Sequence, residues 1–178
     1  MPIISINCLT NELSYQPLCI GAAILDDDYN LKETMCLRLK NSEIVVGVID
    51  NVNIKNILSS MKNIKITGNL SAKLSLFLTD GIEKYFKNNY VIKILITSIK
   101  QGSCMGEMNL LDSYEIQSIL INKQLEIIDV SNMILAKEKK NLSISEYIKC
   151  KGYFPNEQIN YPLGDAINTA IAYSILMK

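Results

Sequence analysis

The 178-residue sequence contains no histidine, and Arg38 is the only arginine among its eighteen basic residues. Without histidine it has no Ser-His-Asp or Cys-His nucleophile, no histidine-bearing zinc site and no imidazole base. The shortage of arginine removes most of the capacity for bidentate recognition of phosphate or guanine. Eighteen acidic residues balance the basic ones, so the net charge gives no reason to expect a nucleic acid or an anionic membrane as partner.

The cysteines form no CxxC pair, and their odd number does not suit a disulfide framework; they are Cys8, Cys19, Cys36, Cys104 and Cys150. We expect reduced thiols in a cytoplasmic protein. No apolar run approaches the roughly 20 residues that a membrane-spanning helix needs, so no membrane association is expected. The length and the 48% hydrophobic content predict one domain over residues 1–178.

The order of predicted elements indicates an α/β fold. Three strands with turn signals between them come first and form an antiparallel meander; their ranges are 3–9, 18–25 and 31–39. A helix starting after Asn69 follows, with its apolar side chains at helical spacing. The remainder predicts a buried strand, a helix, a strand and three helices, at 90–99, 106–121, 125–130, 131–139, 143–151 and 164–177. Residues 42–69 fit either a strand and a short helix or a connection.

Three segments of this chain resemble the proofreading-type DEDD 3'-5' exonucleases of the ribonuclease-H-like superfamily. PLCIGAAILDDD resembles the second strand of that family, and IIDVSNMILAKEKKNLSISEYIKCKGY resembles its Ile-Asp-Thr strand with the two helices that follow. The closing GDAINTAIAY resembles the last helix, Asp-Ala-x-x-Thr-Ala. The resemblance implies a mixed five-stranded sheet, an antiparallel meander plus two parallel strands, flanked by helices, with the strand at 3–9 in the centre beside the strand at 90–98.

The resemblance also implies four carboxylates that hold two divalent metals, and most of these are missing. The Asp-x-Glu positions of the first strand fall on Ser5 and Asn7, and residues 1–11 contain no acid at all. The strand at 90–99, which carries Thr97 and Ser98 near its end, also contains no acid. Asp165 matches the last aspartate of the family. Asn160 stands where one branch has its histidine, and Tyr161 fits the Tyr-x-x-x-Asp spacing of the other branch.

From these residues we expect a nuclease-like domain that has lost catalysis and serves as a binding or scaffolding component. We then expect no metal cofactor. We do expect a protein partner or self-association. An alternative is an active 3'-5' exonuclease with rearranged ligands and bound Mg²⁺ or Mn²⁺, using Glu12, Asp129, Tyr161 and Asp165. A third possibility is a RuvC-like resolvase, whose first-strand aspartate would fall on Asn7.

Ordinary structural roles remain open for the same residues. Asp165 suits the first turn of any helix because of the helix dipole, and Asp129 suits a cap for the helix near Asn132. The acidic run at 26–28 predicts a solvated turn. Five lysines form the one basic concentration, which is either a solvated helix face or a weak nucleic-acid groove: Lys137, Lys139, Lys140, Lys149 and Lys151.

Overall fold

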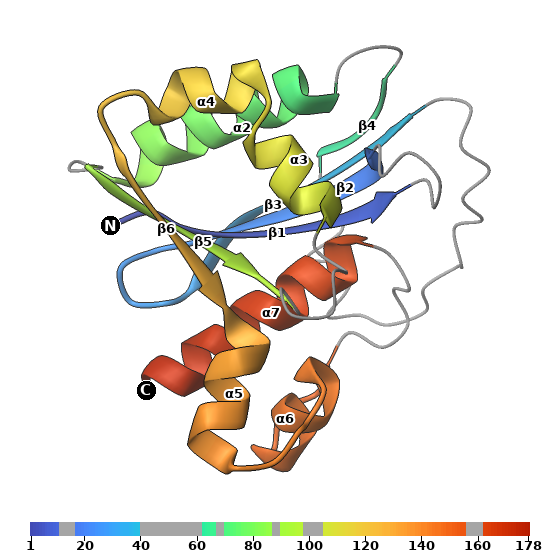
Figure 1. The fold of residues 1–178 in the computed structure, drawn as a ribbon, viewed down its shortest axis with the longest axis vertical. Helices are drawn as coiled ribbons and strands as arrows, with labels where there is room; N and C mark the ends of the chain where they lie inside the picture. Colours follow the sequence, from blue (N-terminus) through green and yellow to red (C-terminus); the bar gives the residue numbers. More distant parts are fainter. Residues whose placement is uncertain (11–16, 40–61, 67–69, 87–89, 98–104, 156–161) are drawn as a thin grey trace.

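The computed structural model describes residues 1–10, 17–39, 62–66, 70–86, 90–97, 105–155 and 162–178. These residues form one mixed sheet with helices on both faces (Figure 1). The sheet has six strands in the order β4-β3-β2-β1-β5-β6. Their bounds are β1 (Ile3–Thr10), β2 (Pro17–Leu25), β3 (Leu31–Leu39), β4 (Lys62–Ile66), β5 (Val91–Ile96) and β6 (Gln124–Asp129).

The predicted sheet is confirmed, with one strand added at its edge. Strands β1, β2 and β3 form the antiparallel meander, and β5 and β6 run parallel beside β1. Both β1 and β5 are interior strands, as expected for segments that are apolar on both faces. The added strand is β4, parallel to β3; it lies in the stretch that the sequence left open, the rest of which lies outside the described residues.

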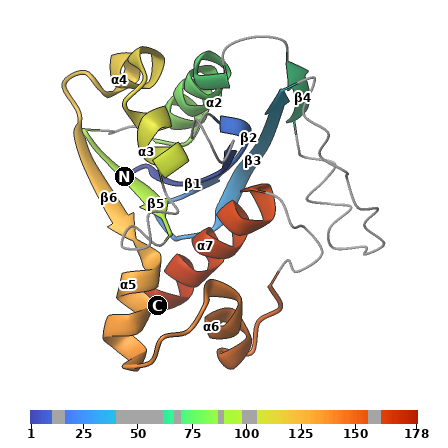
Figure 2. The ribbon, with the colours of Figure 1, turned by 45° about the vertical axis from the view of Figure 1, so that its right-hand side comes forward.

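The two faces of the sheet are covered by different helices, as Figures 1 and 2 show. Helices α2 (Leu70–Tyr85), α3 (Met105–Leu111) and α4 (Tyr114–Leu120) pack on one face. Helices α5 (Val130–Glu138), α6 (Ile144–Cys150) and α7 (Pro162–Met177) lie on the other. Each face has its own apolar core, because side chains alternate along the strands: Ile4 and Ile6 of β1 enter the first core, and Ile3 enters the second.

One helix prediction is wrong. The segment 106–121 is not continuous but forms the two short helices α3 and α4. Ser113 interrupts it: its backbone is extended (φ −65°, ψ 147°) at the N-cap position of α4, and its hydroxyl donates to the carbonyl of Leu110 at 2.6 Å. Serine favours such cap positions because its side chain competes with the helix hydrogen bonds. The break lets α3 lie near the end of β1 while α4 packs on α2.

Helix α7 approaches the sheet closely at a single glycine. A Cβ atom placed on Gly21 of β2 would lie 2.2 Å from the backbone nitrogen of Leu163 and 2.3 Å from the carbonyl oxygen of Pro162. Only glycine permits this approach, because every other residue would push α7 away from the sheet. Gly21 pairs with Asn7 of β1, so the contact also fixes the start of α7 close to the end of β1.

Among the described residues, no helix has both the length and the apolar character needed to cross a membrane. Cys8, Cys19, Cys36 and Cys150 form no disulfide within the described residues, the sulfur atoms of Cys19 and Cys36 lie 3.6 Å apart, and Cys104 lies outside the described residues.

Candidate functional site

A polar pocket of about 520 Å³ opens where the ends of β1 and β5 meet the start of α7. The segment that joins α5 to α6 forms its other wall. Amide, hydroxyl and carboxylate groups make up most of its lining, with two aliphatic side chains: Asn7, Thr97, Ser131, Asn141, Leu142, Ser143, Ile144, Ser145, Glu146, Asp165, Asn168 and Thr169. We call this hollow the polar pocket.

The polar pocket unites positions that the resemblance singled out in distant parts of the sequence. Asn7 from β1, Thr97 after β5 and Asp165 from α7 all line it. Ser5 lies two residues before Asn7, on the same face of β1; its side chain is fully buried and its hydroxyl has no hydrogen-bond partner. The other two positions, Asn160 and Tyr161, lie outside the described residues, as does Ser98.

The sequence reasoning missed Glu107, a buried acid that contacts β1 from the opposite face of the sheet and does not line the polar pocket. It lies in the first turn of α3 and is only 3% exposed. One carboxylate oxygen accepts a hydrogen bond from the backbone nitrogen of Cys8 on β1 at 2.6 Å, and the other is buried without a partner. The strand predicted at 90–99 contains no acid, and Glu107 is the first acid after it in the sequence. The available signal was an acid at the start of the next helix, which packs on β1.

The electrostatics of the site favour proton binding. Burial raises the pKa of Glu107, and the charge of Asp165 adds to that increase against the opposing effect of the Cys8 hydrogen bond. Asp165 is exposed at the residue level, yet the pocket removes part of the water around its carboxylate, and this desolvation raises its pKa. The pKa of the Cys8 thiol is also raised well above its usual value, by burial first and by Glu107 second. The thiol is therefore a poor nucleophile here.

The wall of the pocket contributed by α6 is fixed by a capping box. The Ser143 hydroxyl accepts from the backbone nitrogen of Glu146 at 3.2 Å, and the Glu146 carboxylate accepts from the backbone nitrogen of Ser143 at 2.8 Å. These hydrogen bonds lower the pKa of Glu146. Glu146 therefore faces the pocket as a carboxylate that is already committed to the end of its own helix.

The remaining acids named from the sequence have structural roles. Asp129 is the N-cap of α5 and accepts from the backbone nitrogen of Asn132 at 3.1 Å, as predicted. The acids at 26–28 form the expected turn, where Asp26 accepts from the backbone nitrogen of Asn30 at 2.8 Å. Asp129 is not among the residues that line the polar pocket, and Glu12 lies outside the described residues.

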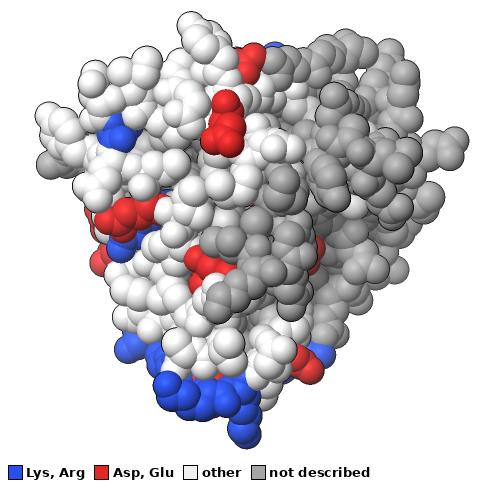
Figure 3. All heavy atoms as spheres, in the orientation of Figure 1, with Lys and Arg blue, Asp and Glu red and all other residues white. Residues whose placement is uncertain are grey.

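The five lysines are exposed at the far end of the molecule, over α5 and α6, where basic atoms gather at the bottom of Figure 3. Lys151 pairs with Glu138 at 3.0 Å, and Lys137 donates to the carbonyl of Leu176 at 3.2 Å. None of the five lines the polar pocket in the described part of the chain, so the pocket offers a phosphate group no lysine partner there.

These residues do not fit a two-metal centre. Such a centre needs several carboxylates that face two cations a few ångströms apart. Serine, asparagine and threonine occupy three of the expected positions, and Glu107 uses one oxygen for Cys8. Across the described ranges, no three histidine, cysteine or acidic side chains group closely enough to hold a metal ion.

Comparisons of sequence find no relative: no family model matches the chain, and no curated protein does. Comparison of structure does find similar proteins. The nuclease domain of 3'hExo, a DEDDh family member bound to rAMP, superposes with a TM-score of 0.58 and 11% identity, over 99% of this chain and 91% of that one. The RNase domain of yeast Pop2 superposes with a TM-score of 0.55 and 11% sequence identity, over 98% of this chain and 76% of that chain. A chain from the structure of the yeast NOT1 MIF4G domain co-crystallised with CAF1 superposes with a TM-score of 0.53 and 12% sequence identity, over 98% of this chain and 78% of that chain.

These similarities establish the fold. The chain has the mixed sheet and flanking helices of ribonuclease-H-like nuclease domains, which confirms the predicted fold class. An identity of 10–12% is too low to transfer activity, so function has to be argued from the polar pocket and the surface.

Proposed function

We propose that this chain is a nuclease-fold domain that does not perform metal-dependent cleavage and that serves as a binding component of an assembly. The observation that carries the proposal is the chemistry of two side chains on one face of β1. Ser5 and Asn7 stand where the resemblance requires two carboxylates, and the Ser5 hydroxyl is buried without a partner. Neither side chain can supply the negative charge that holds a divalent cation.

The charge of the polar pocket supports the same reading. It has carboxylates but no lysine or arginine among its described lining residues, so nothing there offsets the charge of a phosphate backbone. In the exonucleases that the chain resembles, metal ions supply this missing positive charge. Without them the pocket repels the substrate that its position in the fold suggests.

Binding to protein is supported by the surface and by one structural neighbour. Apolar side chains are exposed outside the polar pocket, among them Phe154 and Tyr153. One neighbour of similar fold comes from a co-crystal of the yeast NOT1 MIF4G domain with CAF1, which is an assembly of proteins. We place the domain in the cytoplasm, in keeping with a cysteine pattern that does not suit a disulfide framework.

A second candidate function follows from Glu107. Its carboxylate lies close enough to Asp165 for the charge of Asp165 to raise its pKa. An acid within electrostatic reach of Asp165 suits a metal-dependent exonuclease with rearranged ligands better than the set expected from the sequence does. This candidate requires both carboxylates to be ionised when metal is bound.

A degradation assay decides between the two functions. The full chain is incubated with end-labelled single-stranded RNA and DNA and with Mg²⁺ or Mn²⁺, beside Asp165→Ala, Glu107→Gln and the control Asp112→Ala, which removes an exposed acid elsewhere. We expect no 3'-end shortening above the background of any variant. Shortening by the parent and by Asp112→Ala, but not by Asp165→Ala and Glu107→Gln, establishes the exonuclease instead.

A further inference from the structure

Two cysteines from neighbouring strands lie in contact inside the fold. The sulfur atom of Cys19 on β2 lies 3.6 Å from the sulfur atom of Cys36 on β3, and either thiol can donate a hydrogen bond to the other. In the antiparallel register Cys36 lies opposite Gly21, so Cys19 and Cys36 are diagonal neighbours across the two strands. We call these two residues the cysteine pair.

The cysteine pair lies on the face of the sheet that α7 covers. Ala23 of β2 belongs to the second core, and Cys19 shares its face because side chains alternate along a strand. Cys36 packs against the same core. Gly21, which lies between Cys19 and Ala23 on this face, is the residue that the start of α7 contacts. The pair is therefore next to the place where the first turn of α7 meets the sheet.

The other described cysteines are separated from the pair. Cys8 packs against the first core, on the opposite face of the sheet, and Cys150 is exposed on α6. Within the pair the two thiols differ in access, since Cys19 is 1% exposed and Cys36 is half-buried. A small oxidant therefore reaches Cys36 first, and Cys19 is the thiol in contact with it.

We propose that the cysteine pair is an oxidation site that forms a reversible cross-strand disulfide when the chain meets a hydroperoxide. Hydrogen peroxide transfers one oxygen atom to the Cys36 thiol, which becomes a sulfenic acid, and one water is released. The Cys19 thiol then attacks the Cys36 sulfur, the S–S bond forms, and the sulfenic oxygen leaves as a second water. The two sulfurs lose two electrons, which reduce the O–O bond of the peroxide. A dithiol reverses the reaction by exchange.

Formation of this disulfide has a structural consequence for α7. An S–S bond is about 2.05 Å long, so the two sulfur atoms have to approach each other by about 1.5 Å. Side-chain rotation and local movement of β2 and β3 provide this approach. The contact of Gly21 with α7 is made by backbone atoms and has no flexible side chain to absorb such movement. We therefore expect oxidation to loosen the first turn of α7, which carries Asp165 in the polar pocket.

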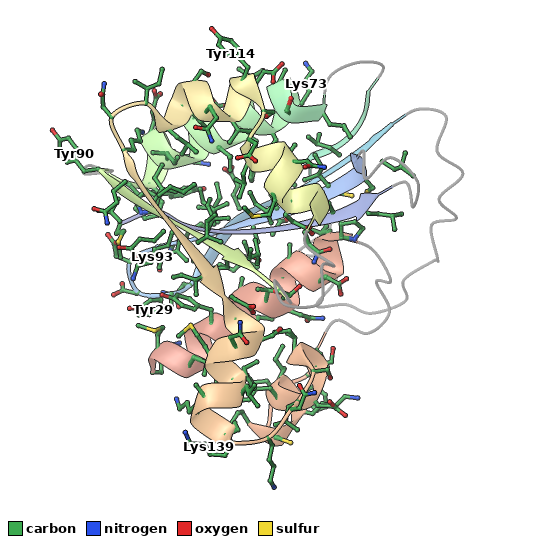
Figure 4. All side chains as sticks on the ribbon, viewed as in Figure 1. Tyr29, Lys73, Tyr90, Lys93, Tyr114 and Lys139 are labelled. Carbon is green, nitrogen blue, oxygen red and sulfur yellow. The ribbon has the colours of Figure 1, made fainter. Side chains whose placement is uncertain are left out.

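The other end of α7 is held independently of the cysteine pair. Tyr29 of the β2–β3 turn, labelled in Figure 4, packs edge-to-face on Tyr173 with ring centroids 6.0 Å apart. This end of α7 also lines a second hollow of about 280 Å³, which we call the α7 groove. Its largely apolar walls come from the β2–β3 turn, the last turns of α7 and the segment after α6, and they include Ile171, Ile175 and the exposed Tyr153 and Phe154. Oxidation should leave this end unchanged.

The first test identifies the disulfide in the folded chain. The background variant Cys104→Ser, Cys150→Ser removes the exposed thiol and the thiol outside the described residues, which prevents links between molecules. After treatment with hydrogen peroxide and alkylation of the remaining thiols, mass spectrometry should show the loss of two hydrogen atoms and a peptide that joins Cys19 to Cys36. A dithiol should restore both thiols.

Matched variants assign the bond. Cys19→Ala and Cys36→Ala should each abolish the linked peptide completely. Cys8→Ala is the control and should form it as the background variant does, because Cys8 lies on the other face of the sheet. Circular dichroism checks that each variant is folded. Absence of the linked peptide in the folded background variant, or a link from either cysteine to Cys8, overturns the proposal.

Hydrogen exchange tests the effect on α7. Amides in the first turns of α7, in peptides within 162–169, should exchange at least about tenfold faster in the oxidised chain than in the reduced chain, and peptides within 171–177 should be unchanged. Equal exchange in both redox states overturns the predicted link to α7. The inference does not depend on the proposed function: neither cysteine lines the polar pocket, so the linked peptide is expected whichever way the degradation assay turns out.

Discussion

The polar pocket and the α7 groove lie along the same helix and differ in almost every property. The N-terminal part of α7 gives the polar pocket Asp165, Asn168 and Thr169, and the C-terminal part gives the groove Ile171 and Ile175. The polar pocket is lined mainly by amide, hydroxyl and carboxylate groups, whereas the groove has exposed aromatics at its lip. The same helix therefore lines a polar hollow with its N-terminal part and a largely apolar hollow with its C-terminal part.

The comparison shows that the position of α7 does not depend on catalytic side chains. Its placement comes from the backbone contact at Gly21 and from buried residues such as Leu163, Ile167 and Ala170, which belong to the second core. None of these residues has a side chain that can act as a catalytic group or a metal ligand. The polar pocket can thus keep its shape while its carboxylates are replaced, and such replacement also removes like-charge repulsion at the end of the sheet.

The largest expected effect comes from a substitution that shifts α7, because both hollows are lined by this helix. Gly21→Ala places a Cβ atom against the backbone of Pro162 and Leu163, which cannot move without shifting α7. We expect the free energy of unfolding to fall by about 3 kcal/mol in urea titrations. Gly81→Ala is the matched control, because its Cβ meets the end of the Ile24 side chain, which can change rotamer. An equal loss in both variants would contradict the role given to the Gly21 contact.

A smaller effect is expected from the wall of the polar pocket alone. Ser143→Ala removes the capping box of α6 and should lower the free energy of unfolding by about 1 kcal/mol. Ser145→Ala is the control, because Ser145 lies two residues further along and lines the same pocket. It should change the free energy of unfolding by less than about 0.5 kcal/mol. If Ser145→Ala costs as much stability as Ser143→Ala, the capping box does not account for the loss.

The smallest effect sharpens the electrostatic side of the comparison. The folded-state pKa of Glu107 is raised, so the folded protein binds more protons than the unfolded chain, and stability from this group falls as pH rises above the ordinary glutamate value of 4.5. Glu107→Gln should remove this fall and raise the free energy of unfolding at neutral pH by roughly 0.5–1 kcal/mol. The measurement is the difference between variant and parent from acid to neutral pH, with the exposed Glu83→Gln as control. If the difference in free energy of unfolding between Glu107→Gln and the parent does not grow with pH, the raised pKa of Glu107 is contradicted.

Much of the fold was predictable because it depends on local patterns. Continuous apolar character placed β1 and β5 inside the sheet, and the spacing from Asp129 to Asn132 predicted the cap of α5. The break between α3 and α4 was not predicted, since the cap at Ser113 interrupts an otherwise helical pattern.

The two hollows were less accessible to sequence reasoning because their residues come together only in three dimensions. Asn7, Thr97 and Asp165 were identified through the resemblance, but Glu107 reaches the end of β1 from a helix on the other face of the sheet. The α7 groove joins the turn near Tyr29 to Phe154, more than a hundred residues later. No periodicity links those segments, so their proximity had no signal in the sequence.

The central claim is that the polar pocket has lost its metal centre through the residues at the end of β1. Its most direct test is thermal unfolding of the parent, of Asp165→Ala and of the double variant Ser5→Asp, Asn7→Glu, each with Mg²⁺ or with potassium at equal ionic strength. We predict that Mg²⁺ leaves the melting temperature of the parent unchanged and raises that of the double variant, because a ligand that binds only the folded state stabilises it. Stabilisation of the parent by Mg²⁺ that disappears in Asp165→Ala would contradict the claim.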